Sequence, residues 1–328
     1  MTTVVVGMCL ILSFALGSVT YVYLYRGNVR YENLSEYLKK GWPIFSPLNC
    51  LLYIFTQPRA SQPIINLDKF HELDDIQKNW ETIRKEVTSL YEQGYFELTT
   101  RADSDASFDI GFRTFFKYGW SKFYLKWYGY THESAKKLCP HTVRILENIP
   151  SVNGAMFAVL PADGQLTRHL DPIACSLRYH LGLDTPNSDD CYINIDGASY
   201  SWRNGEALMF DETYLHYAKN DSKDYRLILM CDVDRPMSFI GRCLNFFYKG
   251  LAKLTVVPNM EGDKRGFANM LFAGLAPINR KLKALKQTNL IRYKVIKHTI
   301  NLTLMLLAIA LLAGLLQLVY TLTMKLAA

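Results

Sequence analysis

Two long stretches without charge, one at each end of the chain, constrain this sequence more than any other feature. Residues 1–25 contain no charged side chain, and residues 299–324 form a second uncharged run. Each run is long enough to cross the roughly 30 Å hydrocarbon core of a bilayer as a helix. Buried core helices are rarely this long and this free of charge. The sequence therefore predicts an N-terminal transmembrane helix over 1–25 and a C-terminal transmembrane helix over 299–324.

The charge of the 328-residue chain is distributed unevenly. Residues 26–234 carry 23 Lys and Arg against 28 Asp and Glu, a balance of −5. Residues 235–297 carry 13 Lys and Arg against only Glu261 and Asp263, a balance of +11. A strongly basic segment beside an apolar run is typical of a juxtamembrane segment that binds anionic lipid. The sequence thus favours a membrane partner and gives no reason to expect a nucleic acid.

The basic residues also predict the orientation of the chain. They lie on the inner side of both apolar ends, namely Arg26, Arg30, Lys39 and Lys40 at one end and Arg280, Lys281, Lys283, Lys286, Arg292, Lys294 and Lys297 at the other. The positive-inside bias then places everything between the two runs in the cytoplasm. The seven cysteines form no Cys-x-x-Cys pair, which indicates a reducing compartment and argues against a cysteine-ligated zinc.

The residue pattern in the middle of the chain changes from helical to β-type near residue 108. Before it, residues 71–91 have the apolar spacing of an amphipathic helix. After it come short β-rich runs separated by turn residues, at 114–125, 155–160, 176–183, 192–196, 199–203, 206–211 and 225–233. Such runs, two of them joined by Asn204-Gly205, indicate an antiparallel barrel or jelly roll. We therefore expect a mainly β fold with helices, of the α+β class.

Five segments follow from these patterns. They are the first apolar run over 1–25, a membrane-proximal helical segment over 26–107, a catalytic β domain over 108–236, a basic juxtamembrane segment over 237–298, and the second apolar run over 299–324. Residues 42–56 are apolar but short and broken by Pro43 and Pro47, and residues 239–257 mix apolar with basic side chains. Both stretches suit helices lying at a membrane interface, although ordinary core packing explains them as well.

One constellation in the β domain carries chemistry. His169 and Asp171 are two positions apart and share a face if the segment is extended, and His216 follows a predicted strand. Two histidines and one carboxylate are the ligand set of the facial triad that leaves positions open on Fe(II). Arg226 comes ten residues after His216, where it can pair with the distal carboxylate of 2-oxoglutarate. Each residue alone is a weak signal, because a single histidine beside a strand is more often structural.

Several runs of the β domain resemble a known family. These runs are HLDP at 169–172, SLRYHLGL at 176–183, YSWRNGE at 200–206, FDETYLH at 210–216 and residues 226–236. They are similar to the aspartyl/asparaginyl β-hydroxylases, and specifically to the bacterial branch that hydroxylates lipid A. The resemblance implies a double-stranded β-helix, or cupin-like jelly roll, in the inner membrane of a bacterium.

The resemblance also implies roles for individual residues. His169, Asp171 and His216 would bind Fe(II), and Arg226 would bind the distal carboxylate of 2-oxoglutarate. Arg178 and His180 would contact the carboxylate at the keto end. Without the resemblance, Arg178 is better explained as a salt bridge of the barrel wall, and His180 as a core histidine bonded to the backbone.

The expected function is an Fe(II)- and 2-oxoglutarate-dependent dioxygenase that uses O2, hydroxylates the 2-position of an acyl chain of lipid A and releases succinate and CO2. Alternative substrates are another membrane lipid, such as an ornithine lipid, or the Asp and Asn side chains of a peptide. A non-enzymatic alternative is a membrane-anchored jelly-roll binding protein with a vestigial iron site. The sequence does not indicate an oligomeric state.

Overall fold

The computed structural model describes residues 2–101, 109, 111–112 and 119–303, and beyond these only 306, 310, 314 and 321. The chain divides into two units, residues 1–270 and residues 271–328. The first unit contains the β domain and its helices.

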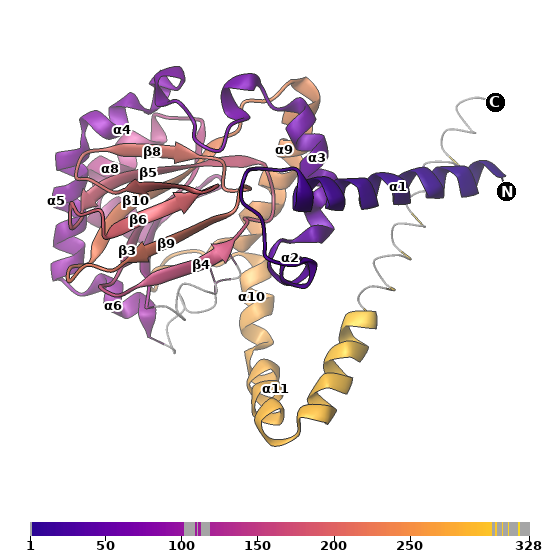
Figure 1. Cartoon of the computed structure of the whole chain (residues 1–328). Coiled ribbons are helices and arrows are strands. Elements are labelled where there is room, and N and C mark those ends of the chain that lie inside the picture. The colour runs from indigo at the N-terminus through magenta and orange to yellow at the C-terminus, as the bar shows by residue number, and fades with distance from the viewer. Residues whose placement is uncertain are drawn as a thin grey trace. The chain divides into compact units, whose positions relative to one another are not determined.

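Within the described residues, two antiparallel sheets face each other (Figure 1). The larger sheet contains, in spatial order, β2 (Tyr130–Thr131), β1 (Ser121–Trp127), β3 (Val152–Leu160), β10 (Arg226–Asp234), β5 (Ser176–Asp184) and β8 (Ala207–Phe210). The smaller sheet contains β4 (Gln165–His169), β9 (His216–Asn220), β6 (Cys191–Ile195) and β7 (Ala198–Ser201). From β3 to β10 the chain passes back and forth between the sheets, which is the topology of a jelly roll, or double-stranded β-helix.

The period-two alternation of the central strands separates two cores. Tyr179 and Leu229 point outward from the larger sheet and are buried against the helices. Met156 and Ile228 point inward and pack with side chains of the smaller sheet. Four polar residues share this inward face, namely Arg178 and His180 on β5 and Arg226 and Asp232 on β10. The alternation of side chains along β5 and β10 therefore places these polar residues inside the barrel.

The chain also forms helices, some of which cover the outer face of the larger sheet (Figure 1). Their bounds are α1 (Thr2–Leu24), α2 (Leu34–Lys40), α3 (Ser46–Phe55), α4 (Asp74–Lys78), α5 (Trp80–Glu92), α6 (Tyr95–Thr100), α7 (Glu133–Leu138), α8 (Pro140–Glu147), α9 (Phe239–Ala252), α10 (Phe267–Gly274) and α11 (Ala276–Thr288). Short 3₁₀ turns lie at Pro43–Phe45, Pro58–Ala60, Leu67–Lys69, His71–Leu73 and Lys253–Thr255. The apolar stripe of α5 packs against β5.

The helix expected over residues 71–91 is broken into three pieces, the 3₁₀ turn His71–Leu73 and the helices α4 and α5. The break lies at Asn79, whose side-chain amide donates to the carbonyl oxygen of Asp75 at 2.8 Å. Such local side-chain bonds compete with the helical ladder, which explains the interruption.

Most of the expected strands are present, including the turn at Asn204-Gly205, where Gly205 has a φ of 77°. Strand β1 begins at Ser121, and residues 114–118 of the run expected at 114–125 lie outside the described residues. The sequence missed β4 and β9, which are short, polar and partly exposed.

The expectation of two flanking transmembrane helices is wrong for the part of the chain that the structure describes. No helix among those residues is both long enough and apolar enough to cross a bilayer. The expected location, a multi-pass protein of the inner membrane with its catalytic domain in the cytoplasm, is overturned by the same finding. Most of the expected C-terminal span, residues 299–324, lies outside the described residues.

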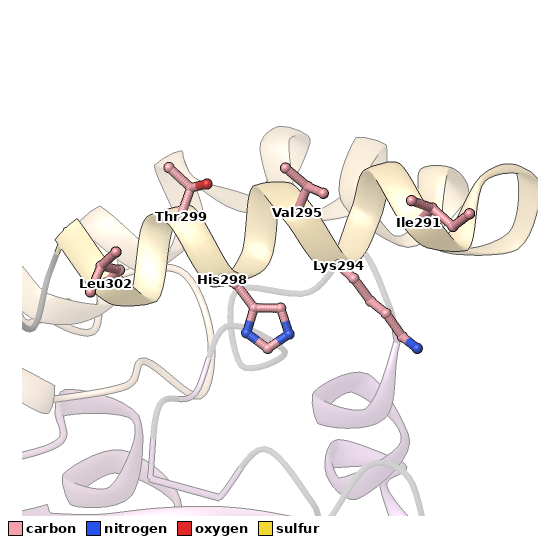
Figure 2. Close-up of a pocket in the computed structure, with 6 residues that line it drawn as sticks. All are labelled: Ile291, Lys294, Val295, His298, Thr299 and Leu302. Carbon is pink, nitrogen blue, oxygen red and sulfur yellow. The ribbon is translucent and has the colours of Figure 1, made fainter.

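In the second unit, residues 290–303 are helical. A shallow hollow follows one face of this helix and is lined by Ile291, Lys294, Val295, His298, Thr299 and Leu302 (Figure 2). Side chains of a single helix cannot enclose a ligand, and none of the candidate site residues lies there, so we assign this hollow no function.

Candidate metal centre

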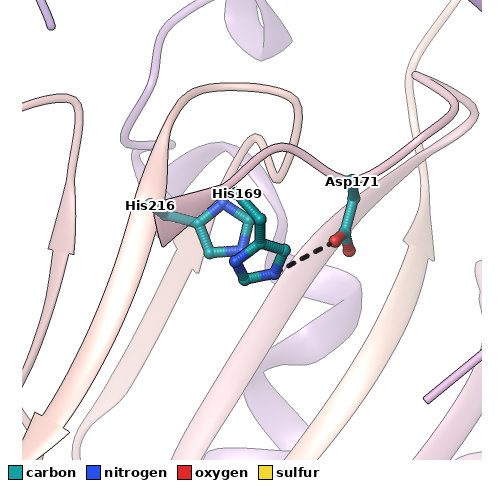
Figure 3. Close-up of side chains that lie close together, drawn as sticks. All are labelled: His169, Asp171 and His216. Carbon is teal, nitrogen blue, oxygen red and sulfur yellow. Dashed lines mark ion pairs between the residues drawn. The ribbon is translucent and has the colours of Figure 1, made fainter. Parts of the chain in front are cut away.

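The structure brings His169, Asp171 and His216 together at one end of the smaller sheet (Figure 3). His169 ends β4 and His216 begins β9, and the two residues are register partners. Their ring centroids lie 4.2 Å apart, and Oδ1 of Asp171 is 3.5 Å from Nε2 of His169. One potential ligand atom from each of the three residues lies within 4.8 Å of the others. The antiparallel pairing of β4 with β9 therefore brings His216 next to His169 and Asp171, although His216 is far from these two residues in the sequence.

Backbone carbonyls orient both rings. Nδ1 of His169 lies 2.8 Å from the carbonyl oxygen of Thr167, and Nδ1 of His216 lies 2.9 Å from that of Tyr214. A ring whose Nδ1 donates to a carbonyl keeps Nε2 as the unprotonated nitrogen, which is the form that binds a metal. Each histidine is therefore held with one nitrogen available.

The protonation states suit metal binding at neutral pH. Burial, together with the neighbouring His169, lowers the pKa of His216 to about 3. Burial alone would raise the pKa of Asp171, but the contacts with His169 and Arg178 outweigh it and lower that pKa. A neutral imidazole and an ionised carboxylate are the ligand forms of these groups. Two histidines and one carboxylate suit Fe(II) with open positions, so the donor set fits the expected metal.

Arg178 is enclosed by carboxylates. Its guanidinium lies 2.9 Å from Asp171 Oδ2 and 3.4 Å from Asp232 Oδ1, and its Nε donates to Glu212 Oε2 at 2.6 Å. Burial raises the pKa of both Glu212 and Asp232. The contact of Arg178 with a co-substrate stays a prediction, while its observed bonds hold the Asp171 carboxylate in place.

Arg226 has the opposite surroundings. Its side chain is fully buried between Trp202 and Trp120, whose ring centroids lie 4.3 Å and 4.8 Å from the guanidinium carbon. None of its three side-chain nitrogens has a hydrogen-bond partner among the described residues. Burial lowers its pKa to about 10, so it remains a cation at neutral pH. A buried cation without a partner is costly, and an anionic ligand would relieve this cost.

His180 lies between the metal cluster and Arg226. Its ring is 5.2 Å from that of Phe210, which is itself 5.6 Å from the His216 ring. On its other side, Trp202 Nε1 lies 3.4 Å from His180 Nδ1. Burial and the charge of Arg226 lower the pKa of His180 well below the usual range, and no described residue forms a hydrogen bond with its Nε2. A row of rings therefore connects the cluster to the unpaired arginine.

A second buried charge cluster holds the segment that leads to His216. The Asp211 carboxylate accepts hydrogen bonds from both terminal nitrogens of Arg235, at 2.8 Å and 2.6 Å, and from one terminal nitrogen of Arg26, at 2.7 Å. Arg26 also stacks on the rings of Tyr53 and Tyr214, at 3.5 Å and 4.1 Å. Arg26, two residues after the end of α1, is thus bonded directly to the segment that carries a candidate ligand.

Sequence reasoning missed the residues around these ligands. Glu212 lies inside the run FDETYLH that drew attention to His216, so its position was a usable signal. The sequence contained no comparable signal for Asp232, for Trp120 or for the ion pair of Arg26 with Asp211, because the partners of these residues are distant in the sequence.

Comparison with known proteins gives a consistent family. A family model described as aspartyl/asparaginyl beta-hydroxylase matches residues 77–236. An ornithine lipid ester-linked acyl 2-hydroxylase of Rhizobium tropici is 32% identical over 203 residues, covering 60% of this chain and 69% of that protein. The human aspartyl/asparaginyl beta-hydroxylase is 32% identical over 122 residues, covering 36% of this chain but only 16% of the human protein. Among solved structures, a prolyl-4-hydroxylase of Pseudomonas putida aligns with a TM-score of 0.26 at 15% identity, over 36% of this chain and 72% of that chain.

Proposed function

Because the chain belongs to the aspartyl/asparaginyl β-hydroxylase family and is an oxidoreductase of the hydroxylase type, we propose that it is an Fe(II)- and 2-oxoglutarate-dependent lipid hydroxylase. The proposed reaction inserts one oxygen atom of O2 at position 2 of an acyl chain, and 2-oxoglutarate is converted to succinate and CO2. The observation that carries the proposal is a His-Asp-His cluster in the same barrel as a buried arginine, Arg226, whose side chain has no hydrogen-bond partner among the described residues.

His169, Asp171 and His216 are the proposed iron ligands. Bound iron with 2-oxoglutarate and O2 supplies the oxidising power that hydroxylation of an unactivated C–H bond requires. Asp171 is held in position by Arg178, and both histidines by backbone carbonyls. These supports fix the three donors before any ligand arrives, which limits reorganisation during turnover.

Arg226 and His180 are the proposed co-substrate residues. A guanidinium can pair with a carboxylate through two parallel hydrogen bonds, and in a dry interior such a pair is strong. Trp202 and Trp120 hold the guanidinium from its faces, which leaves its hydrogen-bonding edge for the distal carboxylate. His180, with its free Nε2, lies on the cluster side of this pair, where the keto end of 2-oxoglutarate would lie.

The substrate proposal rests on the relatives and on the apolar side chains that share the interior with the polar cluster. The Rhizobium relative is named for 2-hydroxylation of an acyl chain, whereas the sequence runs resemble the branch that acts on lipid A. Both lipids present the same chemistry, a methylene group next to an acyl carbonyl. Met156, Ala158, Ile228 and Met230 are buried between the two sheets, and these apolar side chains suit an acyl chain better than a charged peptide. Lipid A is the proposed carrier, with ornithine lipid as the second candidate.

Mass spectrometry tests this proposal. The full-length protein is incubated with Fe(II), 2-oxoglutarate and ¹⁸O2, together with lipid A, an ornithine lipid or an Asp-containing peptide. We expect one labelled oxygen on the carbon next to an acyl carbonyl of lipid A, with an equal amount of succinate. Label on ornithine lipid alone would move the substrate to the second candidate, and label on the peptide alone would overturn the lipid proposal. The matched variants are His216→Ala, which should be inactive, and His71→Ala, an exposed histidine outside the cluster, which should be active.

A further inference from the structure

Helix α9 carries apolar side chains on its outer side as well as on its packed side. The residues that it buries include Gly241 and Asn245. Its outer side exposes Phe246 by 72%, Phe247 by 70% and Leu251 by 65%. The surface helices of a globular protein normally bury their apolar stripe and expose the polar one. Three large exposed apolar side chains on one short helix therefore require a partner.

Helix α3 extends this exposed apolar surface. Its end joins the start of α9, because Ser238 N donates to the carbonyl oxygen of Phe55 at 2.8 Å (Figure 1). The two helices approach closely at Gly241, where an added Cβ would lie 2.8 Å from Cβ of Phe55. Ile54, directly before this contact, is 69% exposed. We call the exposed side chains Ile54, Phe239, Ile240, Phe246, Phe247 and Leu251 the apolar platform.

The inner sides of the same helices hold the chain that follows Asp171. Asn49 of α3 donates to the carbonyl oxygen of Pro172 at 3.0 Å and accepts from Ala174 N at 2.9 Å. Asn245 of α9 donates to the carbonyl oxygen of Cys175 at 3.0 Å. The segment 172–175 is therefore bonded to both helices, so the platform and the candidate ligand Asp171 belong to one continuous structure.

A second connection runs through aromatic side chains. Tyr248 of α9 packs edge-to-face on Tyr128 at 5.7 Å, and the hydroxyl of Tyr128 donates to Asp232 at 3.3 Å. Asp232 in turn contacts Arg178. The far side of α9 is thus a wall of the polar interior that contains the metal cluster.

The charge of this region selects the partner. Residues 237–260 contain no Asp or Glu, and Arg242 and Lys253 are exposed on α9 and directly after it. Exposed aromatic and aliphatic side chains accompanied by cations suit an anionic lipid surface, into which such helices sink by about 5–10 Å. A second copy of the chain would meet the same cations and be repelled by them.

We propose that the apolar platform docks on the surface of anionic lipid bilayers and presents the metal site to acyl chains there. This proposal rests on the proposed function in its choice of a lipid substrate. It concerns helices that lie on a lipid surface, and it adds to the proposed hydroxylase a means of reaching an aggregated substrate.

The test is sedimentation of the full-length protein with vesicles of phosphatidylethanolamine and phosphatidylglycerol, with pure phosphatidylcholine vesicles for comparison. The variant is the double substitution Phe246→Ser with Phe247→Ser. The matched control is Leu98→Ser, which removes an exposed apolar side chain from α6. We expect the double variant to bind the anionic vesicles at least about tenfold more weakly than the wild type, because two buried phenylalanines are lost. Leu98→Ser should bind as the wild type does.

Equal binding by the double variant and the wild type would overturn the proposal. So would a change from dimer to monomer in the double variant without a change in vesicle binding, since the platform would then cover a second copy. Succinate formation with a short-chain, monomerically dispersed lipid separates this outcome from failure of the proposed function. If the hydroxylase proposal holds, the double variant keeps that activity and loses it only on vesicles. Absence of activity in every protein, with vesicle binding intact, would contradict the proposed function and leave the docking surface standing.

Discussion

Two arginines, Arg178 on β5 and Arg226 on β10, point into the same barrel from paired strands but have opposite surroundings. Arg178 contacts three carboxylates, those of Asp171, Glu212 and Asp232. Arg226 contacts none and lies between two tryptophans. Both are buried, so water compensates neither charge.

The difference assigns the two arginines different tasks. A buried charge that is already compensated contributes to folding and to the position of its neighbours. A buried charge without a partner lowers stability unless a ligand completes it. We therefore expect substitution of Arg178 to damage the protein itself, and substitution of Arg226 to damage ligand binding. Variants of the metal ligands, of these two arginines and of a second buried ion cluster test this difference.

Loss of a candidate metal ligand should have the largest effect. His169→Ala and His216→Ala should each lower succinate formation by more than about 100-fold, beyond the 10–100-fold typical of losing an outer partner of a metal ligand. A chelator should abolish wild-type activity, and added Fe(II) should restore it. Bound iron measured in each variant separates loss of metal from loss of fold. Substantial turnover by either variant would show that the ligand set is misassigned.

Arg178→Met should unfold most easily. It leaves the buried Glu212 and Asp232, and the partly exposed Asp171, without their cation. We expect a loss of about 3–5 kcal/mol in the free energy of unfolding, measured in urea. The control is Arg84→Met, which breaks a partly exposed ion pair with Asp184 and should cost less than about 1 kcal/mol. If the two variants were equally stable, the carboxylates around Arg178 would have no structural role.

Arg226→Met should leave the stability of the ligand-free protein unchanged or raised, since it replaces an unpaired buried cation with an apolar side chain. The KM for 2-oxoglutarate should rise by about 10–100-fold, which corresponds to the loss of about 1.5–3 kcal/mol of charge-assisted hydrogen bonding. Thermal unfolding and steady-state kinetics measure the two effects. A strongly destabilised variant would place Arg226 with Arg178 and remove the contrast between them.

The smallest of the predicted effects is the loss of folding stability when acid protonates Asp211, which is paired with Arg235 and Arg26. Burial would raise the pKa of Asp211, but Arg235 and Arg26 outweigh it and lower that pKa to about 2, below its usual 3.8. Because the folded pKa is the lower one, the stabilisation is complete above about pH 4 and is lost as the pH falls towards 2, by about 2 kcal/mol in total.

Urea unfolding between pH 5 and pH 3 measures this contribution. Comparison with Asp211→Asn, which cannot titrate, isolates the part due to Asp211. The stability difference between the two proteins should shrink as the pH falls. A difference independent of pH would contradict the assignment.

The sequence was informative where local pattern decides the structure. Alternating apolar residues predicted β3, β5, β6 and β10, and the short motifs predicted which histidines and carboxylate would meet. It failed for β4 and β9, because each is only five residues long and mostly polar, so it shows no apolar alternation. The pairing of these strands brings His169 and His216 together, and such a long-range contact has no local signal.

Long-range contacts were invisible for a different reason. Arg26 and Asp211 are 185 positions apart, and nothing in either neighbourhood predicts their ion pair. Lack of charge at the chain ends was also an incomplete guide, since it predicted membrane spans that no helix of the described residues forms.

The central claim is that the unpaired charge of Arg226 exists to bind the distal carboxylate of 2-oxoglutarate. Calorimetry of the anaerobic Fe(II) protein tests this most directly, with 2-oxoglutarate compared with 2-oxopentanoate, which has the same carbon chain without the distal carboxylate. The wild type should prefer 2-oxoglutarate by at least about tenfold, and Arg226→Met should bind both alike. Equal affinities in the wild type, or a preference that survives in Arg226→Met, would contradict the account.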